Sequence, residues 1–555
     1  MSAATGPRPD LNETMTRLTG PGGPFELREE EVLGTRMRVF RHRARNLSEI
    51  LADAPRYGDR PYLITADRKV GFAEHARQAA SLARVLREGY GVRPGDRVAI
   101  NGANSPEWIL AFWAVVAAGA VAVACNAWWS RREVEYALDH TDARVLLADA
   151  RRTELMGGTE RPGLPLLTLE EDVPRLAGRH PGERVRVLDT DEDDPAVILY
   201  TSGTSGRMKG AVHSHRNLAS VVEYHRLTRE LARAFDPAEP EVRRYLLALP
   251  LFHIAGLHNL AVPRMADGNT LVVHQGAFDA QRVLELIERE RVTNWGAVPT
   301  MAHRILEYGR AGEHDLSSLT AFSLASAPSS PAFKERLRKG FPAARHNLVD
   351  SYGLTETATA VAAASPADLA EDPGTLGRPI TAVELEIRDA QGRALPEGEE
   401  GEICVRSPFT MLGYWEDAEA TAKALRADRW FHTGDIGVLR EGRVSITGRR
   451  SDLILRGGEN VYPAEVEAVL AEHPRVRECA VLGAPHPDLG QEVMAFVVRE
   501  GAEPLTEQEL ADFVRGELAY FKVPSRWSIC DRALPRNATG KVRRRMLEVA
   551  AGDEE

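Results

Sequence analysis

Apolar residues along the chain recur in two alternating patterns. Helix-like periodicity covers residues 72–88 and 283–291, where apolar side chains return every three or four positions. Short apolar runs between such segments predict strands over 97–100, 145–148, 245–248 and 270–273. This alternation is typical of layered α/β domains with helices on the faces of a sheet, and it continues from about residue 46 to about residue 380.

The pattern changes toward the C-terminus. Short, closely spaced strands with Gly and Pro turns predict a β-rich subdomain over 380–447. After residues 448–452, which we interpret as a hinge, the pattern predicts a helix opened by Pro463, strands over 479–483 and 493–499, a helix from about Thr506 and a strand over 527–530. The predicted fold class is therefore α/β: a large layered N-terminal domain over 46–447 and a small mobile α+β C-terminal domain over 453–555.

Two other segments affect this organisation. Residues 1–45 are interpreted as an N-terminal tail and extension, and the first 24 or so, rich in Gly, Pro and Thr, are expected to be mobile. The uncharged run from Trp108 to Cys125 is long enough to raise a membrane interpretation. Pro106 is typical of a helix start and Gly119 of a helix end, and a helix over 106–118 would span only ~20 Å against ~30 Å of hydrocarbon. We therefore expect a buried helix followed by a buried strand.

Composition narrows the class of protein. The chain has 555 residues, 43% apolar and 27% charged, which predicts a globular protein of at least two domains. Its formal charge of -11 gives no electrostatic reason to expect nucleic-acid binding. Four widely spaced cysteines form no CxxC pair, so neither a disulfide framework nor a zinc knuckle is indicated, and a cytoplasmic location fits. The N-terminus carries no pattern of a secretory signal.

The strongest local signal is YTSGTSGRMKG at 200–210, directly after an apolar strand over 196–199. A loop of Gly, Ser and Thr after a strand lets backbone amides and hydroxyls surround a polyphosphate. Its spacing differs from the Walker pattern, so that mechanism is not implied. A serine-rich surface loop is the alternative. The candidate phosphate-binding residues are Thr201, Ser202, Gly203, Thr204, Ser205, Gly206 and Lys209.

Lysine is scarce in this chain. Only seven of the 70 basic residues are lysines, so a lysine kept within a motif is informative. An ammonium is a small point charge on a flexible stem, whereas guanidinium is a planar fork. Lys209 stands in the loop above, and Lys541 follows a glycine near the C-terminus.

Five motifs together resemble those of the adenylate-forming superfamily, in the family's order and over about residues 46–545. They are YTSGTSGRMKG, DSYGLTET (350–357), HTGD (432–435), GRRSDLILRGGENVYPAEVE (448–467) and LPRNATGKVRRR (534–545). The resemblance implies an acyl-CoA synthetase, a ligase that forms carbon–sulfur bonds and uses ATP, Mg²⁺ and coenzyme A.

The resemblance also implies roles for residues of the large domain. Tyr352 would pack on adenine, Thr355 would reach the α-phosphate, and Glu356 would hold Mg²⁺, with Thr204 as a second candidate ligand. Asp435 would accept both ribose hydroxyls, and Arg449 would contact the ribose. A hard oxygen ligand suits Mg²⁺ at a displacement on phosphorus. As isolated residues, they would be an ordinary turn and helix cap.

Other roles fall near the domain junction and in the small domain. Lys541 is the implied catalytic lysine, because attack of one anion on another needs a cation that holds both. Gly457 and Gly458 match a tunnel for the pantetheine arm, where absent side chains allow close passage. Family members commonly carry Asp or Lys at the hinge, but Ser451 stands there, which leaves the hinge energetics open.

PLFHIAG at 250–256 resembles the motif at the acyl pocket of the family and so bears on which carboxylic acid is the substrate. Amino-acid-activating relatives place Asp after the Phe, whereas this chain has His253, a candidate catalytic and pocket residue that alone would be an ordinary structural histidine. VPTM at 298–301 and ASAPSS at 325–330 match segments that line the acyl pocket in relatives. Their small and apolar residues favour a medium- or long-chain fatty acid, with an aryl or alicyclic acid as the alternative. The candidate pocket residues are His253, Gly256, Val298, Ser326, Ala327 and Gly353.

Alternatives remain for the molecule that accepts the acyl group and for the type of activity. Coenzyme A is favoured, because the chain ends shortly after Lys541 and leaves no room for a carrier domain. A freestanding ligase that loads a carrier protein, a luciferase-like oxygenase and a catalytically inactive binding module are the other interpretations. The resemblance is compatible with a homodimer. PRNATGK at 535–541 matches the spacing that acetyltransferases recognise in some relatives, so an acetyltransferase and a deacetylase acting on Lys541 are candidate partners.

Overall fold

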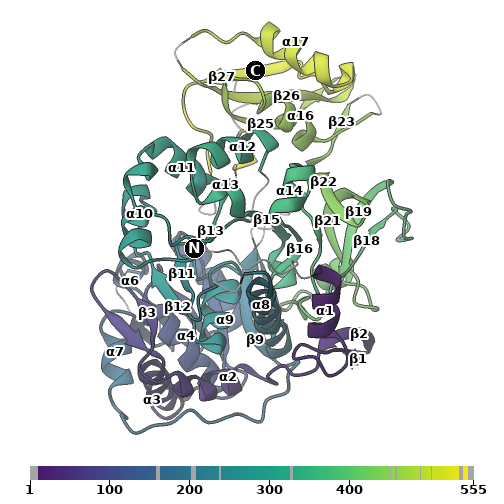
Figure 1. The fold of residues 1–555 in the computed structure, drawn as a ribbon. Coiled ribbons are helices and arrows are strands. Elements are labelled where there is room, and N and C mark those ends of the chain that lie inside the picture. The colour runs from purple at the N-terminus through teal and green to yellow at the C-terminus, as the bar shows by residue number, and fades with distance from the viewer. Residues whose placement is uncertain are drawn as a thin grey trace, which may run out of the picture.

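The structure is a computed structural model with a large lower body and a smaller upper one, the latter formed by the C-terminal part of the chain (Figure 1). It describes residues 10–157, 163–201, 208–236, 239–325, 329–449, 452–456, 459–487, 489–501, 503–536, 542–544 and 546–547. This mixed α/β architecture, with a large N-terminal domain and a small C-terminal domain, confirms the fold class predicted from the sequence pattern.

One sheet of the large domain has the strand order β20-β10-β9-β6-β5-β7-β8. Strands β9, β6, β5, β7 and β8 run parallel, whereas at one edge β10 is antiparallel to β9 and β20 is antiparallel to β10. The bounds are β5 Arg97–Asn101, β6 Val121–Cys125, β7 Val145–Ala148, β8 Leu166–Thr168, β9 Pro195–Thr201, β10 Lys209–Ser214 and β20 Gly413–Tyr414.

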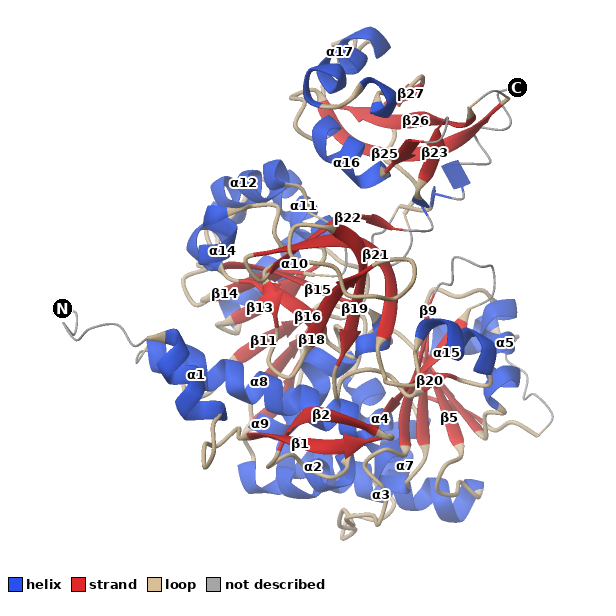
Figure 2. Ribbon diagram, turned by 90° about the vertical axis from the view of Figure 1, so that its right-hand side faces the viewer, coloured by secondary structure: helices blue, strands red, loops and turns tan. Residues whose placement is uncertain are grey.

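A second sheet has the order β17-β16-β15-β14-β13-β11-β12-β3-β4. Its central strands, from β15 to β3 in that order, are parallel. The bounds are β3 Pro61–Ile64, β4 Lys69–Gly71, β11 Arg244–Leu247, β12 Thr270–Val273, β13 Asn294–Ala297, β14 Ala321–Leu324, β15 Leu348–Gly353, β16 Ala360–Ala364 and β17 Arg378–Pro379. Figure 2 shows the two sheets flanking the interior of the large domain.

Helices cover these sheets and bury a common apolar core. The core cluster includes the apolar faces of α3 and α4 and reaches strands of both sheets. The helices of the large domain are α2 Leu47–Asp53, α3 Phe72–Tyr90, α4 Pro106–Ala118, α5 Arg131–Thr141, α6 Ala150–Leu155, α7 Asp172–Ala177, α8 His215–Phe235, α9 Val262–Asp267, α10 Ala280–Arg289, α11 Pro299–Tyr308, α12 Pro331–Gly340, α13 Ala344–Asn347, α14 Pro366–Glu371 and α15 Ala418–Ala424.

The long apolar run is a buried helix and strand, as predicted. Helix α4 spans 13 residues, begins after the Ser105 cap and ends at Gly119, which adopts a left-handed conformation that glycine tolerates. Strand β6 follows at once and is buried throughout. Within the described ranges, no helix combines the length and the apolar character that a membrane crossing needs.

From residue 10 on, the N-terminal extension packs on the large domain, which corrects the expectation of a mobile tail for residues 10–24; residues 1–9 lie outside the described ranges. Helix α1 (Leu11–Thr19) is capped by Asp10, and strands β1 (Leu27–Val32) and β2 (Thr35–Phe40) form a hairpin. Leu18 and Phe25 are buried against α8 and Phe409. The buried side chains of Leu18 and Phe25 hold this segment on the domain. The Gly and Pro residues around them had predicted a mobile tail.

The β-rich region is a sheet of order β18-β19-β21-β22. Its strands are β18 Glu384–Arg388, β19 Glu400–Arg406, β21 Phe431–Arg440 and β22 Arg443–Arg449, and neighbours are antiparallel. The small domain contains β23 Ile454–Arg456, β24 Glu459–Val461, α16 Pro463–Leu470, β25 Val476–His486, β26 Gly490–Arg499, α17 Glu507–Glu517 and β27 Arg526–Cys530. Its helices pack over the long β25–β26 hairpin and its parallel neighbour β27.

Candidate active site

Four motif-bearing segments leave the second sheet at the same edge. Strands β11, β13, β14 and β15 are parallel neighbours, so their carboxyl ends lie together. The segments that follow them contain His253, Val298, Ser329 and Glu356, respectively. Ligands of open α/β sheets bind at this edge, because the connections there are free to vary while the strands hold them in place.

One polar cluster joins the β9–β10 hairpin to the turn after β15. Strands β9 and β10 pair with Lys209 opposite Thr201. The Lys209 ammonium lies 5.1 Å from the centre of the Tyr414 ring, and the Tyr414 hydroxyl donates to Glu356 Oε1 at 2.8 Å. Burial and the nearby Glu356 carboxylate raise the pKa of Tyr414, so its hydroxyl stays a donor at neutral pH. Tyr414 therefore contacts both an ammonium, through its ring, and a carboxylate, through its hydroxyl.

A second cluster surrounds Asp435, which is only 2% exposed. The Tyr352 hydroxyl donates to Asp435 Oδ2 at 2.6 Å, and Arg449 Nε donates to Oδ1 at 2.6 Å. Asp435 and Arg449 face each other in the β21–β22 pair. Burial and the Asp435 carboxylate raise the pKa of Tyr352 well above its ordinary value. A buried carboxylate needs such donors, and its two oxygens are already held in fixed directions.

The turn after β15 links the two clusters. Tyr352 is the last residue but one of the strand, and Glu356 lies in the short 3-10 helix Thr355–Thr357 that follows. The Glu356 carbonyl accepts from Met411 N at 2.8 Å, which ties this turn to the segment that carries Tyr414. Predicted residues from four separate motifs therefore take part in two linked clusters.

The segment after β11 presents aromatic side chains. The Phe252 ring lies 4.9 Å from the Trp128 ring, edge-on, and 4.6 Å from the His253 ring. Trp128 is 55% exposed, whereas Phe252 and Val298 are buried. An aromatic wall therefore borders this part of the edge.

The two glycines predicted to give pocket space also have a backbone reason to be glycine. A Cβ on Gly256 would lie 2.2 Å from the Pro250 carbonyl oxygen, and one on Gly353 would lie 2.5 Å from that of Thr359. Both glycines therefore permit close approach of two chain segments, a role that the sequence did not predict.

The remaining predicted site residues lie outside the described ranges. They are Ser202, Gly203, Thr204, Ser205, Gly206, Ser326, Ala327, Ser451, Gly457, Gly458 and Lys541. Between the two domains, a cavity of about 340 Å³ is lined by residues of α11 and α12, among them Thr300 and Phe333, and by Arg477 of the small domain.

Sequence reasoning did not identify Tyr414. It is one of twelve tyrosines, and its position depends on the pairing of β20 with β10, two strands far apart in the chain. The only local signal is the short GYW segment at 413–415, which is too brief to predict a strand partner.

This arrangement defines a class. At the carboxyl edge of an α/β sheet, β15 and the turn after it contact both a buried aspartate and the cluster beside the β9–β10 hairpin, and a small α+β domain follows. The family model described as AMP-binding enzyme matches residues 51–415, and the model for the AMP-binding enzyme C-terminal domain matches residues 465–541. The chain belongs to the AMP-binding enzymes of the adenylate-forming superfamily and, within them, to the acyl-CoA ligases.

Three similar proteins illustrate the family. Feruloyl-CoA synthase from Amycolatopsis sp is 37% identical over 473 residues, which cover 85% of this chain and 92% of that protein. The fatty acid–[acyl-carrier-protein] ligase ScoC from Streptomyces coeruleorubidus is 32% identical over 496 residues, 88% of this chain and 92% of that protein. The structure of o-succinylbenzoate CoA synthetase MenE from Bacillus subtilis with the acyl-adenylate intermediate OSB-AMP has a TM-score of 0.77 and 31% identity, covering 90% of this chain and 97% of that one.

Proposed function

We propose that this protein joins a carboxylic acid to coenzyme A in two steps that consume ATP. An acid oxygen attacks the α-phosphorus of ATP, the bond to pyrophosphate breaks, and an acyl-adenylate forms. The thiol sulfur of CoA then attacks the acyl carbon, AMP leaves, and the thiol proton passes to solvent. One observation carries this proposal. Tyr352 in β15 and Glu356 in the turn that follows belong to two different polar clusters, so a single short segment connects them.

The Asp435 cluster is proposed to hold the nucleoside. The two oxygens of Asp435 accept from Tyr352 and Arg449, and a ribose offers two neighbouring hydroxyls that a carboxylate accepts in the same bidentate manner. We assign ribose contact to Asp435 and Arg449, and adenine packing to the Tyr352 ring. Thr355, at the start of the 3-10 helix, is assigned to the α-phosphate.

The Lys209 cluster is proposed to hold the phosphates. Lys209 supplies a positive charge, and Glu356 supplies the hard oxygen that a divalent cation prefers. A Mg²⁺ ion held there, with Thr204 as a second candidate ligand, would neutralise charge on the departing pyrophosphate. The Tyr414 hydroxyl fixes one oxygen of Glu356 and so orients the carboxylate before the substrate arrives.

Lys541 is assigned to the adenylation step. Two anions, the carboxylate and the α-phosphate, have to approach each other, and an ammonium that bonds both lowers their repulsion in the transition state. Gly457 and Gly458 are assigned to the path of the pantetheine arm, and Ser451 to the hinge.

We infer that the acid is bulky and apolar, and we put an aryl acid first. The aromatic pair Trp128 and Phe252 beside His253 supports a planar ring more directly than an alkyl chain. The similarity to feruloyl-CoA synthase and o-succinylbenzoate CoA synthetase supports the same order. A medium- or long-chain fatty acid is the second candidate, supported by the similarity to ScoC.

The acceptor is proposed to be free coenzyme A. Of the three similar proteins, two are named for CoA and one for an acyl carrier protein. The cavity between α11, α12 and the small domain is a candidate path for either acceptor, because both present a pantetheine arm.

A panel assay tests the proposal. Purified protein with ATP and Mg²⁺ is given aryl, alicyclic and fatty acids, each with CoA, with a pantetheinylated carrier protein, or with neither. We expect acyl-CoA from an aryl acid and pyrophosphate release that depends on the acid. Thioester formation on the carrier protein alone would replace the proposed acceptor. ATP bound without pyrophosphate release from any acid would contradict the proposed activity.

A further inference from the structure

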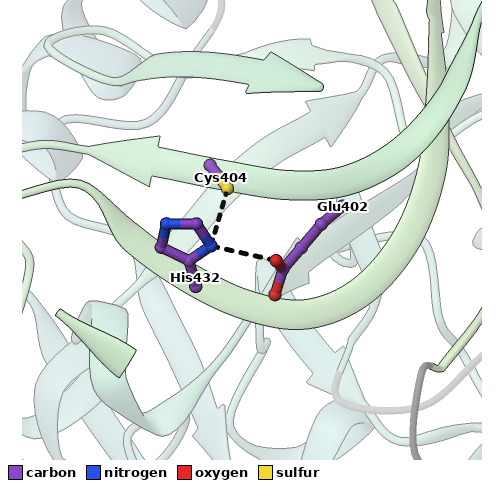
Figure 3. A group of neighbouring side chains, drawn as sticks. All are labelled: Glu402, Cys404 and His432. Carbon is purple, nitrogen blue, oxygen red and sulfur yellow. Dashed lines mark hydrogen bonds and ion pairs between the residues drawn. The ribbon is translucent and has the colours of Figure 1, made fainter. Parts of the chain in front are cut away.

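A group of three side chains lies on the β-rich sheet, apart from the residues assigned above. Glu402 and Cys404 lie on β19, and His432 lies opposite on β21 (Figure 3). Glu402 and Cys404 are two positions apart, so they project from the same face of their strand. Cys404 is paired directly with His432 in the strand register. The fold itself therefore brings a carboxylate, a thiol and an imidazole together.

The ligand atoms converge on one point. His432 Nδ1 lies 2.9 Å from Glu402 Oε2 and 3.4 Å from Cys404 Sγ, and the three atoms all lie within 4.8 Å of one another. Cys404 is fully buried and Glu402 is 8% exposed. Tetrahedral zinc, with bonds of about 2.3 Å to sulfur and about 2.0–2.2 Å to nitrogen and oxygen, requires N···S of about 3.6 Å and N···O of about 3.4 Å. The first two separations therefore need shifts of only about 0.2–0.5 Å.

We propose that Glu402, Cys404 and His432 form a binding site for a transition-metal ion of the Zn²⁺ type, with solvent as a fourth ligand. A thiolate and an imidazole select such a metal over Mg²⁺ or Ca²⁺, which prefer oxygen ligands only. Glu402 is already oriented, because its other oxygen, Oε1, accepts from Gly434 N at 3.0 Å. Such an outer contact fixes the direction of a metal ligand.

Binding has a defined proton balance. Arg426 Nε donates to His432 Nε2 at 3.4 Å, which leaves the ring proton on Nδ1, facing Glu402. A metal at Nδ1 requires the other tautomer, so a proton moves to Nε2 and the Arg426 side chain has to turn away. Arg426 is exposed and can do so. The proton of the Cys404 thiol leaves to solvent when the metal–sulfur bond forms.

The proposed metal site lies next to the Asp435 cluster in the chain but shares no residue with it. Gly434, which donates to Glu402, directly precedes Asp435. A metal bound by Glu402 and His432 would therefore brace the β21 segment that carries Asp435. Metal binding is a separate property from ligation, so its test does not depend on the proposed activity.

The test is metal binding to the full-length protein. Metal-stripped protein is dialysed against Zn²⁺ and analysed for bound metal, and Co²⁺ is added in parallel to detect a thiolate-to-metal charge-transfer band. We expect about one metal per chain, with at least tenfold weaker binding and no such band in Cys404→Ala. Cys479→Ala, which removes a thiol of the small domain, is the matched control and should bind as the unaltered protein does.

Two further variants keep the proposal falsifiable if Cys404→Ala does not fold. Glu402→Gln retains the shape of the side chain and should weaken Zn²⁺ binding at least tenfold. Arg426→Ala removes the donor that competes at the imidazole and should tighten binding severalfold. Absence of stoichiometric binding, or equal binding by the unaltered protein, Cys404→Ala and Glu402→Gln, would overturn the proposal.

Discussion

Two hydrogen-bonded clusters decide what the candidate site can do at the scale of single residues. Asp435 is buried with two donors, and Glu356 is held by a tyrosine that also faces Lys209. In both clusters a carboxylate is oriented before any ligand arrives, which removes part of the ordering cost from the reaction. Because of these contacts, the role of a single side chain can be tested by substitution.

Tyr414→Phe tests the orientation of Glu356. The substitution keeps the ring beside Lys209 and removes a hydrogen bond to a carboxylate, an interaction that contributes about 1.5–3 kcal/mol. We expect the adenylation kcat to fall roughly tenfold, or about 1.4 kcal/mol, with little loss of stability. Acid-dependent pyrophosphate release measures the rate. Tyr308→Phe on α11 is the control, and an equal rate in both variants would rule out the role of Tyr414.

Lys334→Met tests a buried ion pair beneath the site. Lys334 Nζ lies 2.7 Å from Asp350 Oδ2, and both side chains are almost completely buried. Loss of the ammonium leaves a buried carboxylate without its cation, so we expect about 3 kcal/mol of destabilisation in denaturant unfolding. The double variant Lys334→Met/Asp350→Leu should recover most of it. A double variant no more stable than the single one would contradict this account.

At the scale of elements, strand pairing and helix packing bring distant segments into the site. The alternating pattern predicted α3, α4, β7 and β12 closely, because each is apolar on the side that it buries. It could not predict that β20 pairs with β10, because a two-residue strand has no periodicity. The buried anchors Leu18 and Phe25 were missed for a similar reason, since Gly and Pro around them indicated a tail.

The motifs identified residues of the candidate site but not the contacts between them. Asp435, Arg449 and Tyr352 were identified singly, and the structure brings all three into hydrogen-bonding contact. Tyr414 and the Glu402 group were not identified, because their neighbours come from strands that sequence spacing does not connect.

His75 on α3 gives the packing of this element a pH dependence. Burial lowers the pKa of His75 from 6.5 to about 3, so the folded protein resists protonation that the unfolded chain accepts. The unfolded state therefore binds more protons below pH 6.5, and the contribution of His75 to stability is complete above that pH and declines as the pH falls toward 3. At pH 5 the loss is about 2 kcal/mol.

The pH test compares two histidines. Unfolding free energies at pH 7.5 and pH 5 should differ by about 2 kcal/mol less in His75→Leu than in the unaltered protein. His346→Gln, which changes an exposed histidine, should keep the full difference. An unchanged difference in His75→Leu would show that His75 does not contribute to the pH dependence.

At the scale of the whole molecule, the proposed reaction requires the small domain to supply a group to the site on the large domain. The residues assigned to nucleotide and phosphates lie on the large domain, whereas the lysine assigned to adenylation comes from the last part of the chain. A division of this kind lets one domain bind the substrates while the other supplies a group for a single step.

Lys541→Ala tests that division. We expect acid-dependent pyrophosphate release to fall by about 100-fold, because the transition state loses a charge that bridges two anions. Conversion of supplied acyl-adenylate to acyl-CoA should change far less. Lys339→Ala, an exposed lysine on α12, is the matched control. Equal loss in both half-reactions would place Lys541 outside a specific role in adenylation.

The proposed reaction passes through an acyl-adenylate on the path from acid to thioester, and oxygen labelling tests this directly. An acid that the panel identifies is labelled with ¹⁸O in its carboxylate and converted with ATP and CoA, and the products are analysed by mass spectrometry. We expect one labelled oxygen in AMP, because the acid oxygen that attacks the α-phosphorus leaves with AMP when sulfur attacks the acyl carbon. Unlabelled AMP, or label in inorganic phosphate alongside ADP, would contradict it.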